Sequence, residues 1–133
     1  MNRDRPRILL TGAGGRLGSV LAPALAQLGT VRRIGYRSST ELCDHCADLS
    51  VADVVRNLLE SETPNWIVHA AALTDVDMCQ SNPQNAFAAN VETTRHLSNW
   101  ILQRAPAARL IFISTDQVYG GPGPHAEITV APT

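Results

Sequence analysis

Lysine is absent from the sequence, and all eleven basic side chains are arginine. The formal net charge is −1, so the chain lacks the positive excess that binding to nucleic acid or to an anionic membrane surface requires. It also lacks any apolar run approaching the roughly 20 residues of a membrane helix. We therefore expect a small molecule or another protein as partner, with no nucleic acid and no membrane.

Cysteine is scarce, and the N-terminus carries no recognisable secretion signal. Three cysteines cannot all pair, and MNRDRPRILL passes from charge into a short apolar run without a signal-peptide core, which predicts a reducing, cytoplasmic setting. Two of the cysteines form a C-x-x-C pattern, Cys43-Asp44-His45-Cys46. A closed zinc site needs a second pair of ligands, and a redox pair is expected in a different strand context, so we expect no metal site there.

Short apolar runs alternate with segments of helical periodicity. The apolar runs predict strands at 7–11, 31–36, 66–71 and 109–115. The periodic segments predict helices at 19–28, 51–61 and 83–104. This alternation specifies parallel βαβ units with a ligand at the carboxyl ends of the strands. We expect one α/β domain over residues 1–133, a Rossmann-type doubly wound parallel sheet of about five strands that is incomplete.

Polar residues mark the starts of several predicted helices. Ser50 is the expected N-cap of the helix at 51–61, and Asn82 followed by Pro83 is a cap with proline at the first helical position. Asp75 and Asp77 resemble a pair of carboxylates, but we expect them to cap or start a helix.

Three glycines separate the first predicted strand from the first helix. Gly12, Gly15 and Gly18 form G-x-x-G-x-x-G. Glycines allow the backbone to approach a pyrophosphate, and the helix N-terminus then presents free N–H groups to it. The pattern predicts a dinucleotide-binding turn; the alternative is a tight strand-to-helix turn without a ligand.

The end of the second predicted strand carries no carboxylate. An acidic residue there would bind both hydroxyls of an adenosine ribose, whereas this sequence reads Tyr36-Arg37-Ser38-Ser39. Arginine and hydroxyls suit a 2′-phosphate, so we favour NADP(H) over NAD(H) as cofactor. The alternative is that Arg37 is a solvated surface residue.

Five motifs follow one another in an order that resembles a known family. They are TGAGGRLG, CADLS, IVHAAALTDVDMCQSNP, AANVETTRHL and FISTDQVYGG. Together they resemble the extended short-chain dehydrogenase/reductase family, and most closely its dTDP-4-dehydrorhamnose reductase branch. The resemblance implies an NAD(P)-binding domain of a nucleotide-sugar reductase or epimerase, with a dinucleotide cofactor and a nucleotide-sugar substrate.

The resemblance also implies roles for individual residues at the cofactor. It places the pyrophosphate on the glycine turn, adenine at a short Asp-hydrophobic step, and the nicotinamide ribose over a run of small residues. The matching positions are Gly12, Gly15, Arg16, Leu17 and Gly18, then Asp48 and Leu49, then Ala70, Ala71 and Ala72. His69 stands where the branch often has asparagine.

Two matched residues belong to the family's active site. Thr115 matches the Ser/Thr that hydrogen-bonds the substrate, and Asn90 matches the helix asparagine. Asn90 falls on a predicted apolar stripe with Phe87, Val91, Thr94, Leu97 and Ile101. A buried amide needs partners, so a structural hydrogen bond to backbone is the alternative for Asn90. Tyr119 matches a loop aromatic and is not the catalytic tyrosine.

The family's catalytic acid is a tyrosine in Y-x-x-x-K, and its lysine tunes the phenol. This sequence has no lysine, and Glu127 and Pro132 resemble the stretch that precedes that pair. We expect the chain to end before the pair and to lack the C-terminal substrate lobe, which leaves its status as an enzyme open. The alternative is a non-catalytic dinucleotide-binding protein that resembles the regulatory beta subunit of methionine adenosyltransferase. The sheet edge after the last strand is expected to meet a second copy or a partner protein.

Overall fold

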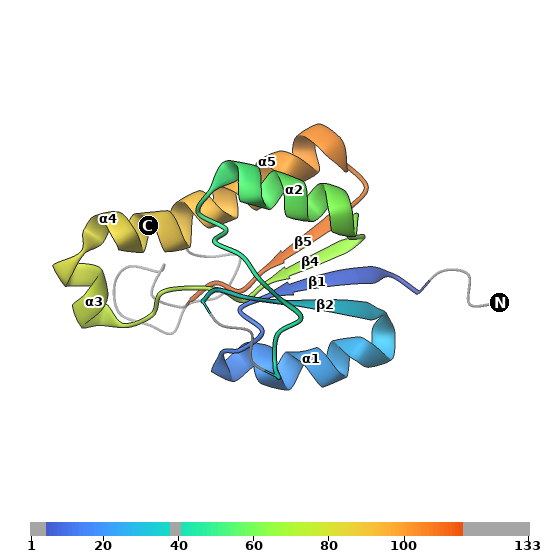
Figure 1. Ribbon diagram of the computed structural model, residues 1–133, viewed down its shortest axis with the longest axis horizontal. Coiled ribbons are helices and arrows are strands. Elements are labelled where there is room, and N and C mark those ends of the chain that lie inside the picture. The colour runs from blue at the N-terminus through green and yellow to red at the C-terminus, as the bar shows by residue number, and fades with distance from the viewer. Residues whose placement is uncertain (1–4, 38–40, 116–133) are drawn as a thin grey trace, which may run out of the picture.

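A computed structural model describes residues 5–37 and 41–115. Within them, five parallel strands form one sheet in the order β3-β2-β1-β4-β5 (Figure 1). The strands are β1 (Arg7–Thr11), β2 (Thr30–Gly35), β3 (His45–Cys46), β4 (Trp66–His69) and β5 (Arg109–Phe112). The chain fills one half of the sheet with β2 and β3, then returns to the other side of β1 for β4 and β5. The expected doubly wound α/β sheet is confirmed.

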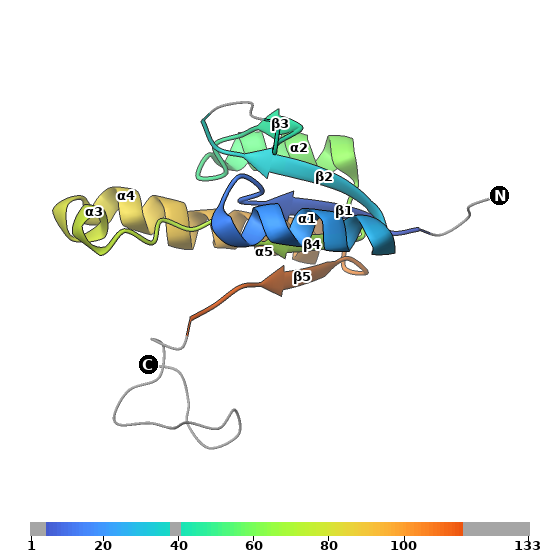
Figure 2. The ribbon, with the colours of Figure 1, turned by 90° about the horizontal axis from the view of Figure 1, so that it is seen from below.

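Helices cover both faces of the sheet, with α1 on one side and α2 and α5 on the other (Figures 1 and 2). The helical segments are α1 (Arg16–Leu28), α2 (Ala52–Glu62), α3 (Val76–Ser81), α4 (Pro83–Phe87), the π-helix η1 (Ala88–Glu92) and α5 (Thr93–Arg104). Among the described residues, no helix is both long and apolar enough to span a membrane.

Each face of the sheet has its own apolar core. Leu9, Ile34 and Ile67 pack toward α2 and α5, against Leu97 and Trp100 among others. On the other face, a second cluster packs against apolar side chains of α1 and contains Ile8, Leu10, Ala13 and Val68. Because β1 is covered on both faces, its sequence RILLT reads as a continuous apolar run. Burial of each such large side chain contributes about 1.5–3 kcal/mol.

The helical segment after β4 begins as the sequence predicts. The Asp75 side chain accepts a hydrogen bond from the Met78 backbone N–H at 2.9 Å and caps α3. Asn82 accepts from the Asn85 N–H at 3.1 Å and caps α4, with Pro83 at its first turn. These two capping predictions are confirmed.

The long helix predicted from residue 83 is continuous but contains a π-helical turn. In η1 the Thr93 N–H bonds the Ala88 carbonyl, so the turn holds one more residue than an α-helical turn. The extra residue rotates the apolar stripe about the helix axis. Phe87 and Val91 are therefore 50% and 39% exposed, whereas Leu97 is fully buried. The single stripe predicted for this helix was wrong at its N-terminal end.

Two further local predictions need correction. Val51, and not Ser50, is the N-cap of α2, because the Asp48 carboxylate holds both the N–H and the hydroxyl of Ser50. The C-x-x-C stretch, where the sequence predicted no strand, contains β3, and its residues His45 and Cys46 pair with the end of β2. The side chains of Cys43 and Cys46 are free thiols.

Several predicted features lie outside the described residues. These are Ser38, Ser39, Tyr119, Glu127 and Pro132. At the edge strand β5, Ile111 and Phe112 are 43% and 50% exposed. The expectation that another chain covers this edge stays a prediction.

We expect Gly18→Ala to lower the free energy of unfolding by roughly 3 kcal/mol or more. A Cβ at Gly18 would lie 2.0 Å from the Gly12 carbonyl oxygen, so backbone must move. Gly14→Ala is the matched control, since its Cβ meets only the Cys43 sulfur at an ordinary 3.4 Å. Urea unfolding followed by circular dichroism measures both variants. Equal losses would contradict the assigned packing of the glycine turn.

Candidate functional site

A cavity of about 350 Å³ opens at the carboxyl ends of the strands, where a ligand is expected in this fold. Its walls come from the ends of β1 and β2, the loop before α2, the loop after β4, and α3, α4 and η1. Six residues predicted to bind the cofactor line it: Gly12, Arg37, Asp48, Leu49, Ala71 and Ala72. Leu73, Ala88, Ala89 and Thr93 also line it.

The glycine turn leads from β1 into the N-terminus of α1. Gly12 has a φ of 68°, and a Cβ there would lie 2.7 Å from the Ala71 backbone nitrogen. The Gly15 N–H donates to the Gly12 carbonyl at 3.0 Å and closes the turn. Gly15 then caps α1 without a side chain, and the first turn of the helix holds no acidic residue. This arrangement leaves the positive end of a 13-residue helix open to an anion.

The glycine-turn residues differ in exposure. Gly15, Arg16 and Leu17 are exposed, whereas Gly18 is buried beneath the turn. None of these four lines the cavity, and Ala70 packs instead in the core on the α1 side of the sheet. Gly18 therefore has a packing role that the structure shows directly, and the exposed positions are those with room for a ligand.

Arg37 lies at the mouth of the cavity beside Tyr36. Its guanidinium carbon is 5.0 Å from the centre of the Tyr36 ring, and both residues are exposed. Stacking on an aromatic ring restricts an arginine without neutralising it. The arrangement suits the binding of an additional phosphate at the end of β2.

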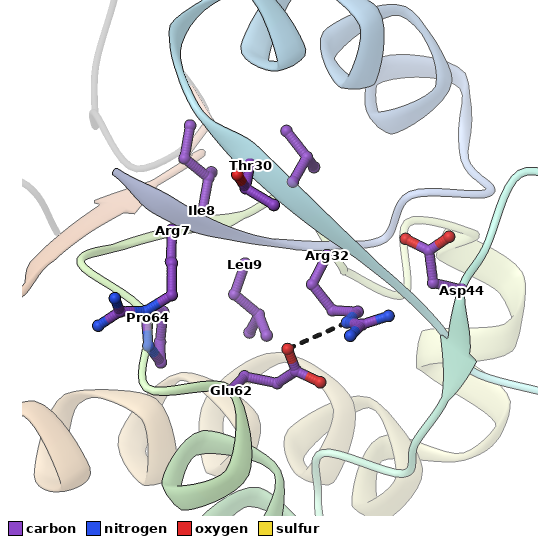
Figure 3. A pocket seen from close by; sticks show the side chains of 9 residues that line it. Arg7, Ile8, Leu9, Thr30, Arg32, Asp44, Glu62 and Pro64 are labelled. Carbon is purple, nitrogen blue, oxygen red and sulfur yellow. Dashed lines mark hydrogen bonds and ion pairs between the residues drawn. The ribbon is translucent and has the colours of Figure 1, made fainter. Parts of the chain in front are cut away.

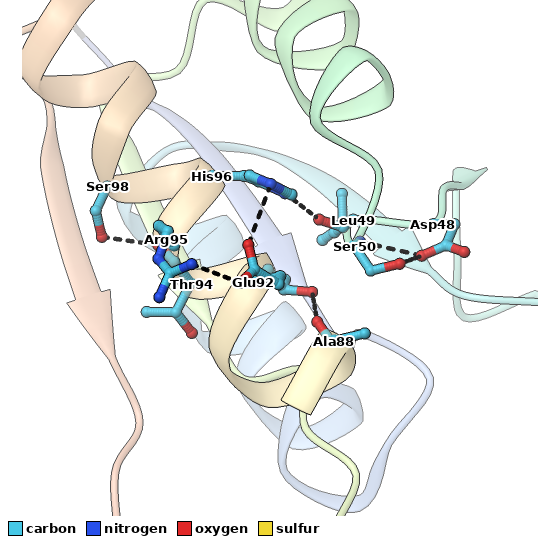
Figure 4. Close-up of polar contacts among 10 residues, drawn as sticks. Asp48, Leu49, Ser50, Ala88, Glu92, Thr94, Arg95, His96 and Ser98 are labelled. Atoms are coloured by element: carbon cyan, nitrogen blue, oxygen red, sulfur yellow. Dashed lines mark hydrogen bonds and ion pairs between the residues drawn. The ribbon is translucent and has the colours of Figure 1, made fainter. Parts of the chain in front are cut away.

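The Asp48–Leu49 loop is fixed from two sides (Figure 4). Asp48 Oδ1 accepts from the Ser50 N–H at 3.0 Å and from its hydroxyl at 2.6 Å. On α5, His96 Nδ1 donates to the Leu49 carbonyl at 3.1 Å. These contacts hold the loop in one conformation at the cavity wall.

Asn90 lies in η1, and its side-chain amide forms hydrogen bonds with the loop after β4. Its Oδ1 accepts from the Leu73 N–H at 2.7 Å, and its Nδ2 donates to the Leu73 carbonyl at 3.0 Å. The structure thus shows the backbone hydrogen bonding that the sequence left open, and Leu73 is itself a cavity residue. Thr115 is exposed after β5 and does not line the cavity. The catalytic roles of Asn90 and Thr115 stay predictions.

His69 has a larger structural part than the sequence indicated. It ends β4, is 1% exposed, and stacks on Phe112 with ring centres 5.8 Å apart. Its two ring nitrogens face Thr11 and Thr94. Burial lowers the pKa of His69 from 6.5 to about 4, so the ring is neutral at pH 7. The only sequence signal was a polar residue at the end of an apolar strand.

A second cavity, of about 340 Å³, lies at the opposite ends of the strands (Figure 3). Arg32 and Glu62 meet across it at 3.0 Å. Nearby, Asp44 pairs with Arg33 at 2.7 Å, which raises the pKa of the arginine and lowers that of the carboxyl. Arg7, which also lines this cavity, donates to the Thr63 carbonyl at 2.7 Å. The amino ends of parallel strands are not where this fold binds ligands.

Comparisons with known proteins agree with this geometry. A model of the RmlD substrate binding domain family matches residues 6–130. The chain is 38% identical over 119 residues to the dTDP-4-dehydrorhamnose reductase of Streptomyces griseus, covering 90% of this chain and 36% of that protein. It is 34% identical over 115 residues to that of Aggregatibacter actinomycetemcomitans, covering 86% and 36%. The chain thus spans about a third of the length of these relatives.

Solved structures show the same relationship. A hypothetical dTDP-4-dehydrorhamnose reductase from Sulfolobus tokodaii aligns with a TM-score of 0.81 and 30% identity, over 96% of this chain and 45% of that one. The dTDP-4-dehydrorhamnose reductase of Bacillus anthracis, solved in complex with NADP, aligns with a TM-score of 0.71 and 27% identity, over 93% and 41%.

The neutral state of His69 predicts a pH dependence of stability. Its pKa is about 4 when folded and about 6.5 when unfolded, so the unfolded chain binds more protons between these values. The contribution of His69 to the free energy of unfolding is therefore fully present above pH 6.5 and is lost as the pH drops toward 4. We expect His69 to account for a loss of about 2 kcal/mol between pH 7 and pH 5.

Urea unfolding at both pH values measures this loss. The variant His69→Asn should show a pH-dependent loss smaller by that amount. The same loss in His69→Asn as in the unchanged chain would rule out His69 as its source.

Proposed function

Because the chain belongs to the RmlD substrate binding domain family, we propose that it is the part of a nucleotide-sugar reductase that holds the dinucleotide, with NADP(H) favoured over NAD(H). The observation that carries this proposal is the cavity at the carboxyl ends of the strands, which gathers six of the residues predicted for cofactor binding. The NADP complex of the Bacillus anthracis relative supports dinucleotide binding.

Each wall of the cavity suits a different part of the cofactor. The turn from Gly12 to Gly18 would hold the pyrophosphate, because α1 begins there without an acidic residue and Gly15 offers no side chain. Asp48 and Leu49 would contact adenine, and Arg37 a 2′-phosphate. Ala70, Ala71 and Ala72 would lie beneath the nicotinamide ribose, where small side chains leave room.

Bound NADP(H) would supply the hydride, and the described residues would bind the cofactor and orient the reacting groups. We propose that Thr115 orients a keto-sugar carbonyl. Asn90 would act through backbone, since both polar atoms of its amide are bonded to Leu73. These roles concern the reductase as a whole, of which this chain represents about a third by comparison with its relatives.

A second candidate function is dinucleotide binding without catalysis. The cavity suits this function as well, because the residues that line it are those predicted to bind the cofactor. Consumption of NADPH, followed by absorbance in the presence of a nucleotide keto sugar, tests this candidate. Turnover by the 133 residues would eliminate it, whereas saturable binding without turnover is expected from either function.

Isothermal titration of the chain with NADPH tests the proposed function. We expect saturable binding, and we expect Gly15→Val to raise the Kd more than about tenfold, because a branched side chain crowds the place where backbone meets pyrophosphate. Gln27→Val, exposed near the other end of α1, is the control and should leave the Kd unchanged. Unaltered affinity in Gly15→Val would refute the phosphate-binding turn.

Titration with NADPH and NADH in parallel tests the role of Arg37. We expect Arg37→Ala to weaken NADPH binding by about tenfold and NADH binding by less, because only NADPH carries the additional phosphate. Arg56→Ala is the control, because Arg56 lies on α2 in an exposed pair with Asp53. Equal losses of affinity for NADPH and for NADH would show that Arg37 does not recognise the additional phosphate.

A further inference from the structure

A series of three hydrogen-bonded side chains, two of them buried, crosses from β1 through β4 to the α5 helix. Thr11 Oγ1 lies 2.6 Å from His69 Nδ1, and His69 Nε2 lies 3.0 Å from Thr94 Oγ1. Thr11 is fully buried and His69 is 1% exposed. We call these three residues the His69 bridge.

The outer contacts of the His69 bridge fix the direction of its hydrogen bonds. The Thr11 oxygen accepts from the Ala71 N–H at 3.2 Å, so the Thr11 hydrogen is available to His69 Nδ1. At the other end, Thr94 donates its hydrogen to the Asn90 carbonyl at 3.0 Å and can only accept from His69. One neutral tautomer, with the proton on Nε2, satisfies every bond.

The other protonation states would each break a bond. A proton on Nδ1 would leave the hydrogen of the fully buried Thr11 without its acceptor. An unprotonated Nε2 would compete with the Asn90 carbonyl for the Thr94 hydrogen. Because an unmade buried hydrogen bond is costly, the Nε2–H tautomer is selected.

The His69 bridge joins two segments of the chain that line the cavity. Thr11 directly precedes Gly12, and its oxygen holds the backbone of Ala71. Thr94 holds the Asn90 carbonyl, and the Asn90 side chain holds Leu73. Gly12, Ala71 and Leu73 all line the cavity, as do Ala88, Ala89 and Thr93 of the π-turn region.

The π-helical turn lies at the point where the bridge reaches the helix. Thr93 bonds the Ala88 carbonyl through its N–H and, at 3.3 Å, through its hydroxyl. The bridge then bonds the neighbouring residue, Thr94, so two successive threonines hold this turn from within. A π-turn is less favourable than an α-turn and persists where its surroundings hold it.

We propose that His69 is a positioning residue which, as the neutral Nε2–H tautomer, holds the π-turn and Asn90 against Leu73 and so sets the opening of the dinucleotide cavity. It acts through Thr94, and it does not itself line the cavity. The inference rests on the proposed function for its binding consequence, but its geometric part stands on the hydrogen bonds alone.

The test interrupts the bridge at Thr94. Thr94→Val keeps the shape of the side chain and removes the oxygen, whereas Thr94→Ser restores the oxygen. We expect Thr94→Val to raise the NADPH Kd about tenfold and Thr94→Ser to change it less than about threefold. Ser98→Ala is the matched control, since it removes a hydroxyl bond to the Thr94 carbonyl that lies outside the bridge (Figure 4). It should bind NADPH normally.

Nuclear magnetic resonance provides a second readout that does not depend on binding. The ¹⁵N shifts of His69 should report a neutral ring protonated at Nε2. Thr94→Val should speed amide exchange at Leu73 about tenfold, while core strand amides exchange as in Ser98→Ala. A merely structural loss would speed all of these amides together.

The outcomes separate the inference from the proposed function. Failure of the unchanged chain to bind NADPH would overturn the proposed function, and the Leu73 exchange would then decide the positioning role. An Nδ1-protonated ring, or unaltered Leu73 exchange in Thr94→Val, would overturn the inference. So would normal NADPH affinity in Thr94→Val when the unchanged chain binds.

Discussion

Close backbone packing at the end of β1 is the constraint on which the rest of the structure depends. Gly12 adopts a left-handed φ and lies against the Ala71 backbone. Gly18, in the first turns of α1, packs directly against the Gly12 carbonyl. No side chain fits at either contact. The approach brings the ends of β1 and β4 together with the start of α1, and the ligand-binding edge of the sheet is assembled around that meeting point.

Such close packing leaves polar groups that water cannot reach, and the fold satisfies them with its own side chains. The Ala71 N–H bonds Thr11, and Thr11 in turn bonds His69. The same logic continues outward, since Asn90 takes both backbone groups of Leu73. Side chains of Thr11 and Asn90 therefore hold backbone groups of two cavity residues, Ala71 and Leu73. Beside the glycine turn the cavity is lined by small residues, with Gly12, Ala71 and Ala72 among them.

Local signals predicted the parts of the fold that local interactions determine. The strands were visible as apolar runs because β1 and β4 are buried on both faces, and the caps at Asp75 and Asn82 followed from side chains that bond within three residues. Ser50 is not the cap of α2: its N–H and hydroxyl both donate to Asp48, two residues earlier, and the helix begins after Val51. The short β3 escaped notice because two residues carry no periodicity.

Local sequence patterns could not predict the parts of the site that depend on contacts between residues far apart in the chain. His69 meets Thr11 across 58 positions and Thr94 across 25, and no spacing in the sequence announces either contact. The sequence carries no local signal for the π-turn either, because the turn arises from the hydrogen bonds that Thr93 and Thr94 make inside the fold. Resemblance supplied five cavity residues correctly as neighbours, and the end of the second strand supplied Arg37. The resemblance did not show that Gly18 is buried beneath the turn or that Ala70 packs against the core on the α1 side.

A neutral histidine suits the central position for a physical reason. A threonine hydroxyl can reverse its direction, so a bridge made only of hydroxyls would have no fixed polarity. The imidazole accepts on one side and donates on the other, which orders both threonines at once. Burial reinforces the choice, because it disfavours the charged ring that would donate on both sides and lowers the His69 pKa to about 4. The same burial therefore also selects the protonation state that keeps the cavity wall hydrogen-bonded at neutral pH.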